Sequence, residues 1–160
     1  MIPVKRQVVA VAQVYYAGGV FHTTALVQGQ TGAWISVLPE VVSSTGDAQA
    51  LAEALDSVRP HSQRWRRNRP ELDMIPWDGD AGRVWQGASH LWSVRWYSDG
   101  SVLLAPQTRF HSDEPDLARG EGWQRVAGAE RTFGPPVSSS TIAEQIVAGA
   151  EGAAGASQKP

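Results

Sequence analysis

His90-Leu-Trp-Ser-Val-Arg-Trp-Tyr-Ser-Asp-Gly-Ser-Val-Leu-Leu-Ala-Pro106 is the stretch that predicts the centre of the fold. Its residues alternate with a period of two, which puts Trp92, Val94 and Trp96 on one side of an extended strand. Asp99-Gly100 supplies the positive φ that a tight reversal needs, so the chain is predicted to return antiparallel. The stretch therefore predicts a β-hairpin with one strongly apolar face.

The loop of this hairpin decides its register, and the sequence leaves two registers open. With a two-residue loop, Tyr97 pairs with Val102 and Trp96 pairs with Leu103. A three-residue loop with Gly100 in the left-handed conformation shifts the pairing by one residue. In both registers the tryptophans share a face, and their burial is worth several kcal/mol, so other elements must cover that face.

The N-terminal part of the chain predicts three strands and a helix. Residues 7–16 and 20–27 are β-branched and apolar runs separated by a glycine pair, which indicates a second hairpin. Residues 33–38 predict a third strand, which we expect the following proline to stop. The alanine-rich stretch 48–58 has apolar residues at helical spacing, and Pro60 is expected to end this helix.

The C-terminal part predicts a loop-rich bridge, further strands and a second helix. Residues 59–87 contain three prolines, which interrupt every regular period. Residues 122–127 alternate like a short strand. Thr141-Ile-Ala-Glu144 has the pattern of a capping box at the start of a helix. Residues 151–160 carry no large apolar side chain and are predicted to be a disordered tail.

These elements predict an α+β fold, a mainly antiparallel sheet with two helices packed on one face. Residues 1–150 are expected to form a single domain. Its two parts, 1–58 and 88–150, are similar in outline and are joined by the Pro/Arg-rich bridge. No residue-by-residue repeat relates them, so duplication is a hypothesis about structure only.

Composition narrows the classes of function. The chain has 160 residues, no cysteine and a formal net charge of −2. The lack of cysteine fits a reducing compartment and excludes thiol chemistry and cysteine-ligated zinc. No run approaches the roughly 18 apolar residues of a membrane span, so we expect a cytoplasmic protein without membrane contact. The small net charge gives no global attraction for nucleic acid.

The sequence contains four histidines, and none belongs to a recognised catalytic or metal-binding motif. His22 lies within a predicted strand and is expected to be surface-facing or hydrogen-bonded. His111 stands close to Asp113, Glu114 and Asp116, for which a solvated polar loop is a better interpretation than a divalent-ion site. We therefore expect no enzymatic activity, no cofactor and no metal.

The segment His61-Ser-Gln-Arg-Trp-Arg-Arg-Asn-Arg69 is the one charged feature that stands out. One interpretation is a solvated loop whose arginines pair with the acidic residues of 71–80. A second is contact with a protein partner, because arginine and tryptophan are favoured interface anchors. A third, disfavoured by the net charge, is nucleic-acid binding through phosphate contacts and base stacking. The candidate partner-binding residues are Arg64, Trp65, Arg66, Arg67 and Arg69.

The motif Trp92-Ser-Val-Arg-Trp-Tyr-Ser-Asp-Gly-Ser-Val, followed by Gly122-Trp-Gln-Arg-Val-Ala and Thr132-Phe133 before a capped helix, resembles small immunity proteins of bacterial contact-dependent growth inhibition and related toxin systems. The resemblance spans residues 90–150. It implies a cytoplasmic α+β protein that neutralises its cognate toxin domain by occluding the active site or substrate surface. The near-neutral charge departs from the acidic balance of many such proteins. The alternative function is a nucleic-acid-binding module that uses residues 59–69. A third hypothesis is an enzyme whose catalytic residues are dispersed along the chain.

Overall fold

The computed structural model describes residues 6–28, 34–44, 46–68, 75, 79–111 and 121–157. The elements of this part of the chain are, in order, β1 (Val8–Ala17), β2 (Val20–Gln28), β3 (Trp34–Ser44), α1 (Ala48–Asn68), α2 (Asp80–Gln86), β4 (His90–Tyr97), β5 (Val102–His111), β6 (Glu121–Arg125), β7 (Arg131–Phe133) and α3 (Ser139–Ser157). The predicted α+β class with an antiparallel sheet is confirmed.

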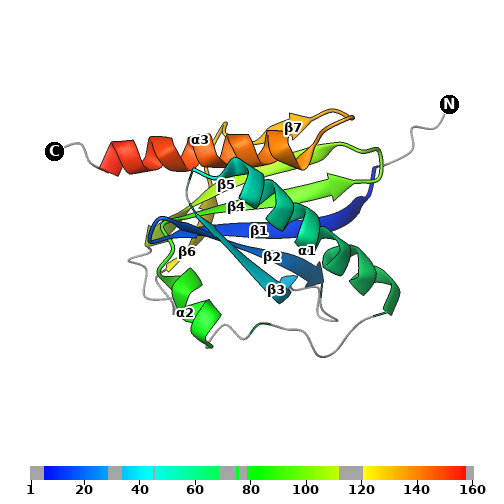
Figure 1. Ribbon diagram of the computed structural model, residues 1–160, viewed down its shortest axis with the longest axis horizontal. Coiled ribbons are helices and arrows are strands. Elements are labelled where there is room, and N and C mark those ends of the chain that lie inside the picture. The colour runs from blue at the N-terminus through cyan, green and yellow to red at the C-terminus, as the bar shows by residue number, and fades with distance from the viewer. Residues whose placement is uncertain are drawn as a thin grey trace.

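The sheet has the strand order β3-β2-β1-β4-β5-β6, and β7 also pairs with β5 (Figure 1). Strands β1 and β4 meet at its centre, where Val14 lies opposite Trp92. From this centre each half of the chain extends outward to one edge and ends in a long helix. In the second half, β6 and β7 both pair with the outer side of β5. Strand β6 pairs with residues 107–111 of β5, and β7 pairs with residues 102–104.

The β4–β5 hairpin adopts the three-residue loop. Trp96 pairs with Val102, and the amide of Tyr97 donates a hydrogen bond of 3.0 Å to the carbonyl of Ser101. Gly100 has φ +86°, which residues other than glycine rarely adopt. The loop is therefore residues 98–100, the second of the two registers that the sequence allows.

The main core lies between the sheet and the two long helices. Trp92, Val94 and Trp96 are all buried in it, so the predicted apolar face of the hairpin is confirmed. Figure 1 shows α1 and α3 on this face of the sheet. The helices contribute Leu51, Leu55 and Val58 from α1 and Ile142, Ile146 and Val147 from α3.

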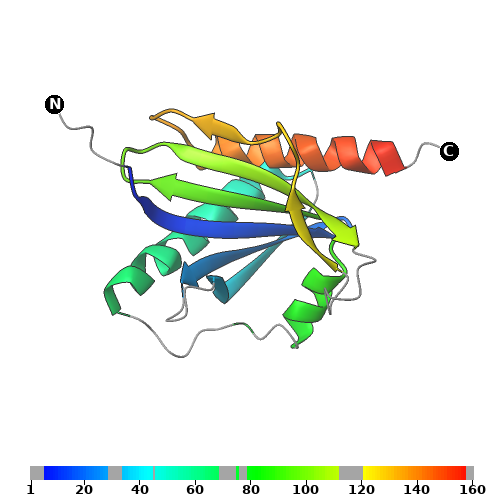
Figure 2. The same ribbon diagram turned by 180° about the vertical axis from the view of Figure 1, so that it is seen from behind.

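The opposite face carries a third helix, α2, which the prediction of two helices lacks. Figure 2 shows α2 at one end of this face, while β1, β4 and β5 have no helix over them. A second cluster of buried side chains lies here, formed by Tyr15, Ile75, Trp85, Ala88 and Leu91. With seven residues, α2 has no repeating apolar period for a sequence to reveal.

The prediction that Pro60 ends the first helix is wrong, because α1 continues to Asn68. Proline removes one backbone hydrogen bond and strains the turn before it. Val58 and Ser62, on either side of the proline, are both buried. Packing against the sheet thus offsets the local cost, and the predicted bridge 59–87 contains the last turns of α1 and all of α2.

Two further boundaries differ from the prediction. Strand β3 passes through Pro39 instead of stopping there, because the register shifts between Thr24 and Ala25 and leaves residues 38–39 as an irregularity opposite β2. Helix α3 reaches Ser157, so residues 151–157 of the predicted disordered tail are helical. The tail lacks large apolar side chains, but it is rich in alanine, which has the highest helix propensity. Residues 158–160 lie outside the described residues.

A buried hydroxyl of α1 joins two strands of the sheet. The amide of Val11 donates to Oγ of Ser62 at 2.8 Å, and this hydroxyl donates to the carbonyl of Leu26 at 2.6 Å. Val11 and Leu26 form the last pair of β1 with β2. At this pair, the hydroxyl of Ser62 therefore lies between the Val11 amide and the Leu26 carbonyl, which would otherwise form a hydrogen bond with each other.

We expect Ser62→Ala to lower the free energy of unfolding by about 2–3 kcal/mol, because it leaves a buried amide and a buried carbonyl without partners. Urea denaturation measures this loss, and the Val11 amide should also exchange faster with deuterium. Ser57→Ala, at an exposed position of the same helix, is the control and should change stability by under about 0.5 kcal/mol. An equally small effect of Ser62→Ala would contradict the prediction and would show that the Val11 amide and the Leu26 carbonyl bond to each other in the variant.

Candidate functional site

The candidate partner-binding positions 64–67 lie at the C-terminal end of α1. The backbone of residues 64–68 is helical, which differs from the expected loop. The side chains of Arg64, Trp65, Arg66 and Arg67 lie outside the described part of the structure, as does all of Arg69. The acidic residues Asp113, Glu114 and Asp116 also lie outside it.

The helical backbone gives the arginine positions a fixed spacing. Positions 64 and 67 follow Pro60 by four and seven residues, so they fall on the same side of α1 as this exposed proline. The buried residues Val58 and Ser62 mark the other side of the helix. Figures 1 and 2 show the C-terminal end of α1 extending beyond the ends of β2 and β3.

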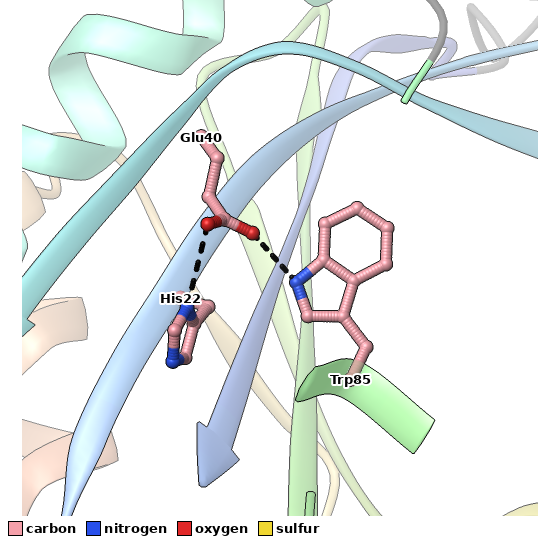
Figure 3. A network of polar contacts seen from close by, with 3 residues as sticks. All are labelled: His22, Glu40 and Trp85. Carbon is pink, nitrogen blue, oxygen red and sulfur yellow. Dashed lines mark hydrogen bonds and ion pairs between the residues drawn. The ribbon is translucent and has the colours of Figure 1, made fainter. Parts of the chain in front are cut away.

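A second candidate site is a polar network at α2, drawn in Figure 3. The indole Nε1 of Trp85 donates a hydrogen bond of 2.8 Å to Oε2 of Glu40. The other carboxylate oxygen, Oε1, lies 3.5 Å from Nδ1 of His22. The three residues come from α2, β3 and β2, so the network joins the short helix to two strands.

Strand pairing and aromatic packing position these side chains. His22 lies between its cross-strand partners, Tyr15 of β1 and Val42 of β3. Glu40 precedes Val42 by two residues, so its side chain lies on the same face of β3. The ring of Trp85 stacks on that of Tyr15, with centroids 5.1 Å apart and planes 6° from parallel. Burial and stacking thus hold the indole N–H in the direction of the carboxylate.

The geometry attaches α2 to the sheet. The side chains of His22 and Glu40 are 12% and 20% exposed, and His22 Nδ1 makes no hydrogen bond in the described part of the chain. A carboxylate beside an imidazole is a component of many acid–base sites. Among the described residues, no group of three or more potential metal ligands occurs. The expectation for His22, a surface or hydrogen-bonded histidine, omitted Glu40 and Trp85, which are remote in sequence.

His90 is a titratable group packed among aromatic rings at the start of β4. Its imidazole stacks on Trp92 with centroids 6.1 Å apart and lies edge-on to Tyr16. Nδ1 lies 3.0 Å from Oγ of Ser89. Burial disfavours the charged imidazolium and lowers the pKa of His90 from the ordinary value of 6.5.

This lowered pKa predicts that stability falls on acidification. Below pH 6.5 the unfolded chain binds a proton at His90 more readily than the folded chain does, so the free energy of unfolding decreases as pH falls from about 7.5 to about 5.5. His90→Asn should make this decrease shallower. Urea melts of both proteins across this range give the difference, and equal slopes would contradict the prediction.

Two large apolar side chains are exposed near this network among the described residues. They are Val42 of β3, 56% exposed, and Val84 of α2, 40% exposed. Val42 is the cross-strand partner of His22, and Val84 directly precedes Trp85. The border of the polar network is therefore partly apolar.

No protein-family model, curated protein or solved structure matches this chain. The candidate sites are accordingly defined by the geometry of the chain itself. None of the helices in the described part combines the length and the apolar character needed to cross a membrane.

Proposed function

We propose that this chain is a non-enzymatic, immunity-type protein that binds a toxin domain in the bacterial cytoplasm. It neutralises the toxin by occluding the active site or the substrate surface. The resemblance of residues 90–150 to immunity proteins supports the proposal. The observation that carries it is the helical continuation of α1 to Asn68, which includes positions 64, 66 and 67 of the arginine-rich segment.

A helix suits this segment for binding because it fixes the spacing of the anchors in advance. A loop has to lose backbone freedom when it binds, and that loss weakens affinity. Arginine and tryptophan are enriched among the residues that dominate interface energies. A specific complex needs about 800 Å² of surface from each partner, and it needs no catalytic constellation.

The test replaces Arg64, Arg66, Arg67 and Arg69 together by serine. The toxin candidate is the protein encoded by the neighbouring reading frame, because immunity proteins are encoded beside their toxins. We expect calorimetry to show a fall in affinity of more than about tenfold, equal to 1.4 kcal/mol or more. A control replaces three exposed arginines elsewhere, Arg83, Arg125 and Arg131, and should bind like the unaltered protein.

The alternative function makes a different demand on the same variants. If the segment binds nucleic acid, the unaltered protein binds RNA or DNA with a steep salt dependence, and the quadruple variant loses that dependence. Denaturant melts of each variant confirm that folding is intact. Unchanged toxin affinity together with no nucleic-acid affinity would reject both functions for this segment.

A further inference from the structure

Strand β3 forms one edge of the sheet, and part of that edge has no backbone partner among the described residues. Toward its start, the carbonyl of Ser36 accepts a hydrogen bond of 2.9 Å from the amide of Ile75, so the chain covers this part itself. At its end, the carbonyl of Ser44 accepts from Asp47 in the turn into α1. Residues 40–43 lie between, and no backbone hydrogen bond on their outer side occurs in the described part of the chain.

The direction of the free backbone groups follows from the strand ladder. The backbone carbonyl of Leu26 is directed toward β1, because it accepts from the Ser62 hydroxyl that also accepts from the amide of Val11. The direction of the backbone N–H and C=O groups alternates along a strand. The backbone groups of His22 are therefore also directed toward β1, and those of the residues beside it are directed toward β3. Val42 pairs with His22, and its amide and carbonyl are therefore directed away from the sheet.

Natural sheets normally protect such edges with charges, prolines or covering segments. Here Pro39 lies just outside the free stretch. The only charged residue in 40–44 is Glu40, whose carboxylate is bound by Trp85 within the chain. Val42 is 56% exposed, and α1 and α3 cover only the other face of the sheet. Within the described part of the chain, this stretch of edge is thus short, apolar at its centre and not guarded by a free charge.

We propose that this edge pairs with the same edge of a second copy of the chain. The two copies of β3 align antiparallel about a twofold axis at Val42, which joins the two sheets into one. The proposal is independent of toxin binding and of the arginine-rich segment.

The sequence of the free edge is self-complementary in this arrangement. Val42 lies opposite its own copy and exchanges both backbone hydrogen bonds with it. Glu40 aligns with Ser44, whose carbonyl already accepts from Asp47, so the new bonds centre on Val42. No like charges face each other across the pair, although like charges directly opposite are destabilising. An isologous contact of this kind closes at two copies, so it gives a dimer instead of a growing fibre.

Sedimentation velocity of the unaltered chain should show a dimer at about 100 µM and a shift toward monomer on dilution. Val42→Lys places two like charges at the twofold axis, and we expect it to weaken self-association by more than about tenfold. Val84→Lys is the matched control, because it adds the same charge at the other exposed valine, on α2. It should dimerise like the unaltered chain.

A cross-link tests the register directly. The chain has no cysteine, so Val42→Cys introduces a single thiol. In the proposed pairing the two Cα atoms at position 42 lie about 5.5 Å apart, within the range of a disulfide. Oxidation should therefore give a covalent dimer with Val42→Cys and much less with Val84→Cys. A monomeric unaltered chain at about 100 µM, or a dimer that Val42→Lys leaves intact, would overturn the proposal.

Discussion

Replacing Trp85 by alanine is expected to lower the free energy of unfolding by about 3–5 kcal/mol, the range for large aromatic side chains removed from a core. Trp85 is 1% exposed and belongs to the smaller core cluster. Its ring stacks on Tyr15, and its N–H is bound by Glu40. The substitution removes the packing and also leaves a partly buried carboxylate without its donor. Denaturant melts followed by circular dichroism measure the loss.

A conservative variant separates packing from hydrogen bonding at this position. Trp85→Phe retains an aromatic ring against Tyr15 but has no N–H for Glu40, so we expect it to lose about 1–2 kcal/mol. Val84→Ala, at the exposed neighbouring position, should be nearly neutral. A loss below about 1 kcal/mol for Trp85→Ala would show that α2 contributes little to the stability of the sheet.

Trp96→Ala should destabilise the protein by a similar amount, about 3–5 kcal/mol, through the main core. Trp96 is 4% exposed among the residues between the sheet and the two long helices. The guanidinium of Arg59 lies 5.2 Å from the centre of its ring, on the side of α1. The change thus opens a cavity beneath α1 and removes a cation–π contact.

The same denaturant series measures the Trp96 effect. Because domains are stable by only about 5–15 kcal/mol, Trp96→Phe provides a milder variant that is expected to remain folded. It should lose less than Trp96→Ala while keeping the cation–π geometry. A loss below about 1 kcal/mol for Trp96→Ala would contradict its burial.

The central hairpin was predictable because its signals are local. Alternation from Trp92 to Trp96 sets the buried face, and Asp99-Gly100 sets the reversal. The register depends on the φ of Gly100, and both loop lengths use that glycine. A sequence motif can therefore predict that a hairpin exists and leave its pairing open by one residue.

The helices were predicted less well, because contacts remote in sequence decide where they end. Pro60 is a strong local signal for termination, yet the buried residues beyond it keep α1 helical to Asn68. Helix α2 is stabilised by Tyr15 and Glu40, which lie on two different strands. No window of the sequence around Trp85 contains these partners.

The candidate sites divide in the same way. The arginine-rich segment 59–69 was identified from composition alone, whereas the helical backbone of its residues up to Asn68 was not expected. His22 was identified only as a histidine in a strand. Its carboxylate neighbour Glu40 became visible once β2 and β3 were paired in register. The free edge at Val42 likewise depends on the order of the strands, which a list of strands does not contain.

The central pairing of β1 with β4 has a consequence for synthesis of the chain on the ribosome. Val14 and Trp92, which face each other, are separated by roughly 80 residues, so at 5–20 residues per second β4 emerges about 4–16 s after β1. During that interval the run Val8-Val-Ala-Val-Ala-Gln-Val-Tyr-Tyr16 has one strand edge without its final neighbour. Such apolar β-rich runs are prone to aggregation while exposed. Slower elongation lengthens the exposure, so we expect the yield of soluble protein to depend on translation speed across residues 17–90.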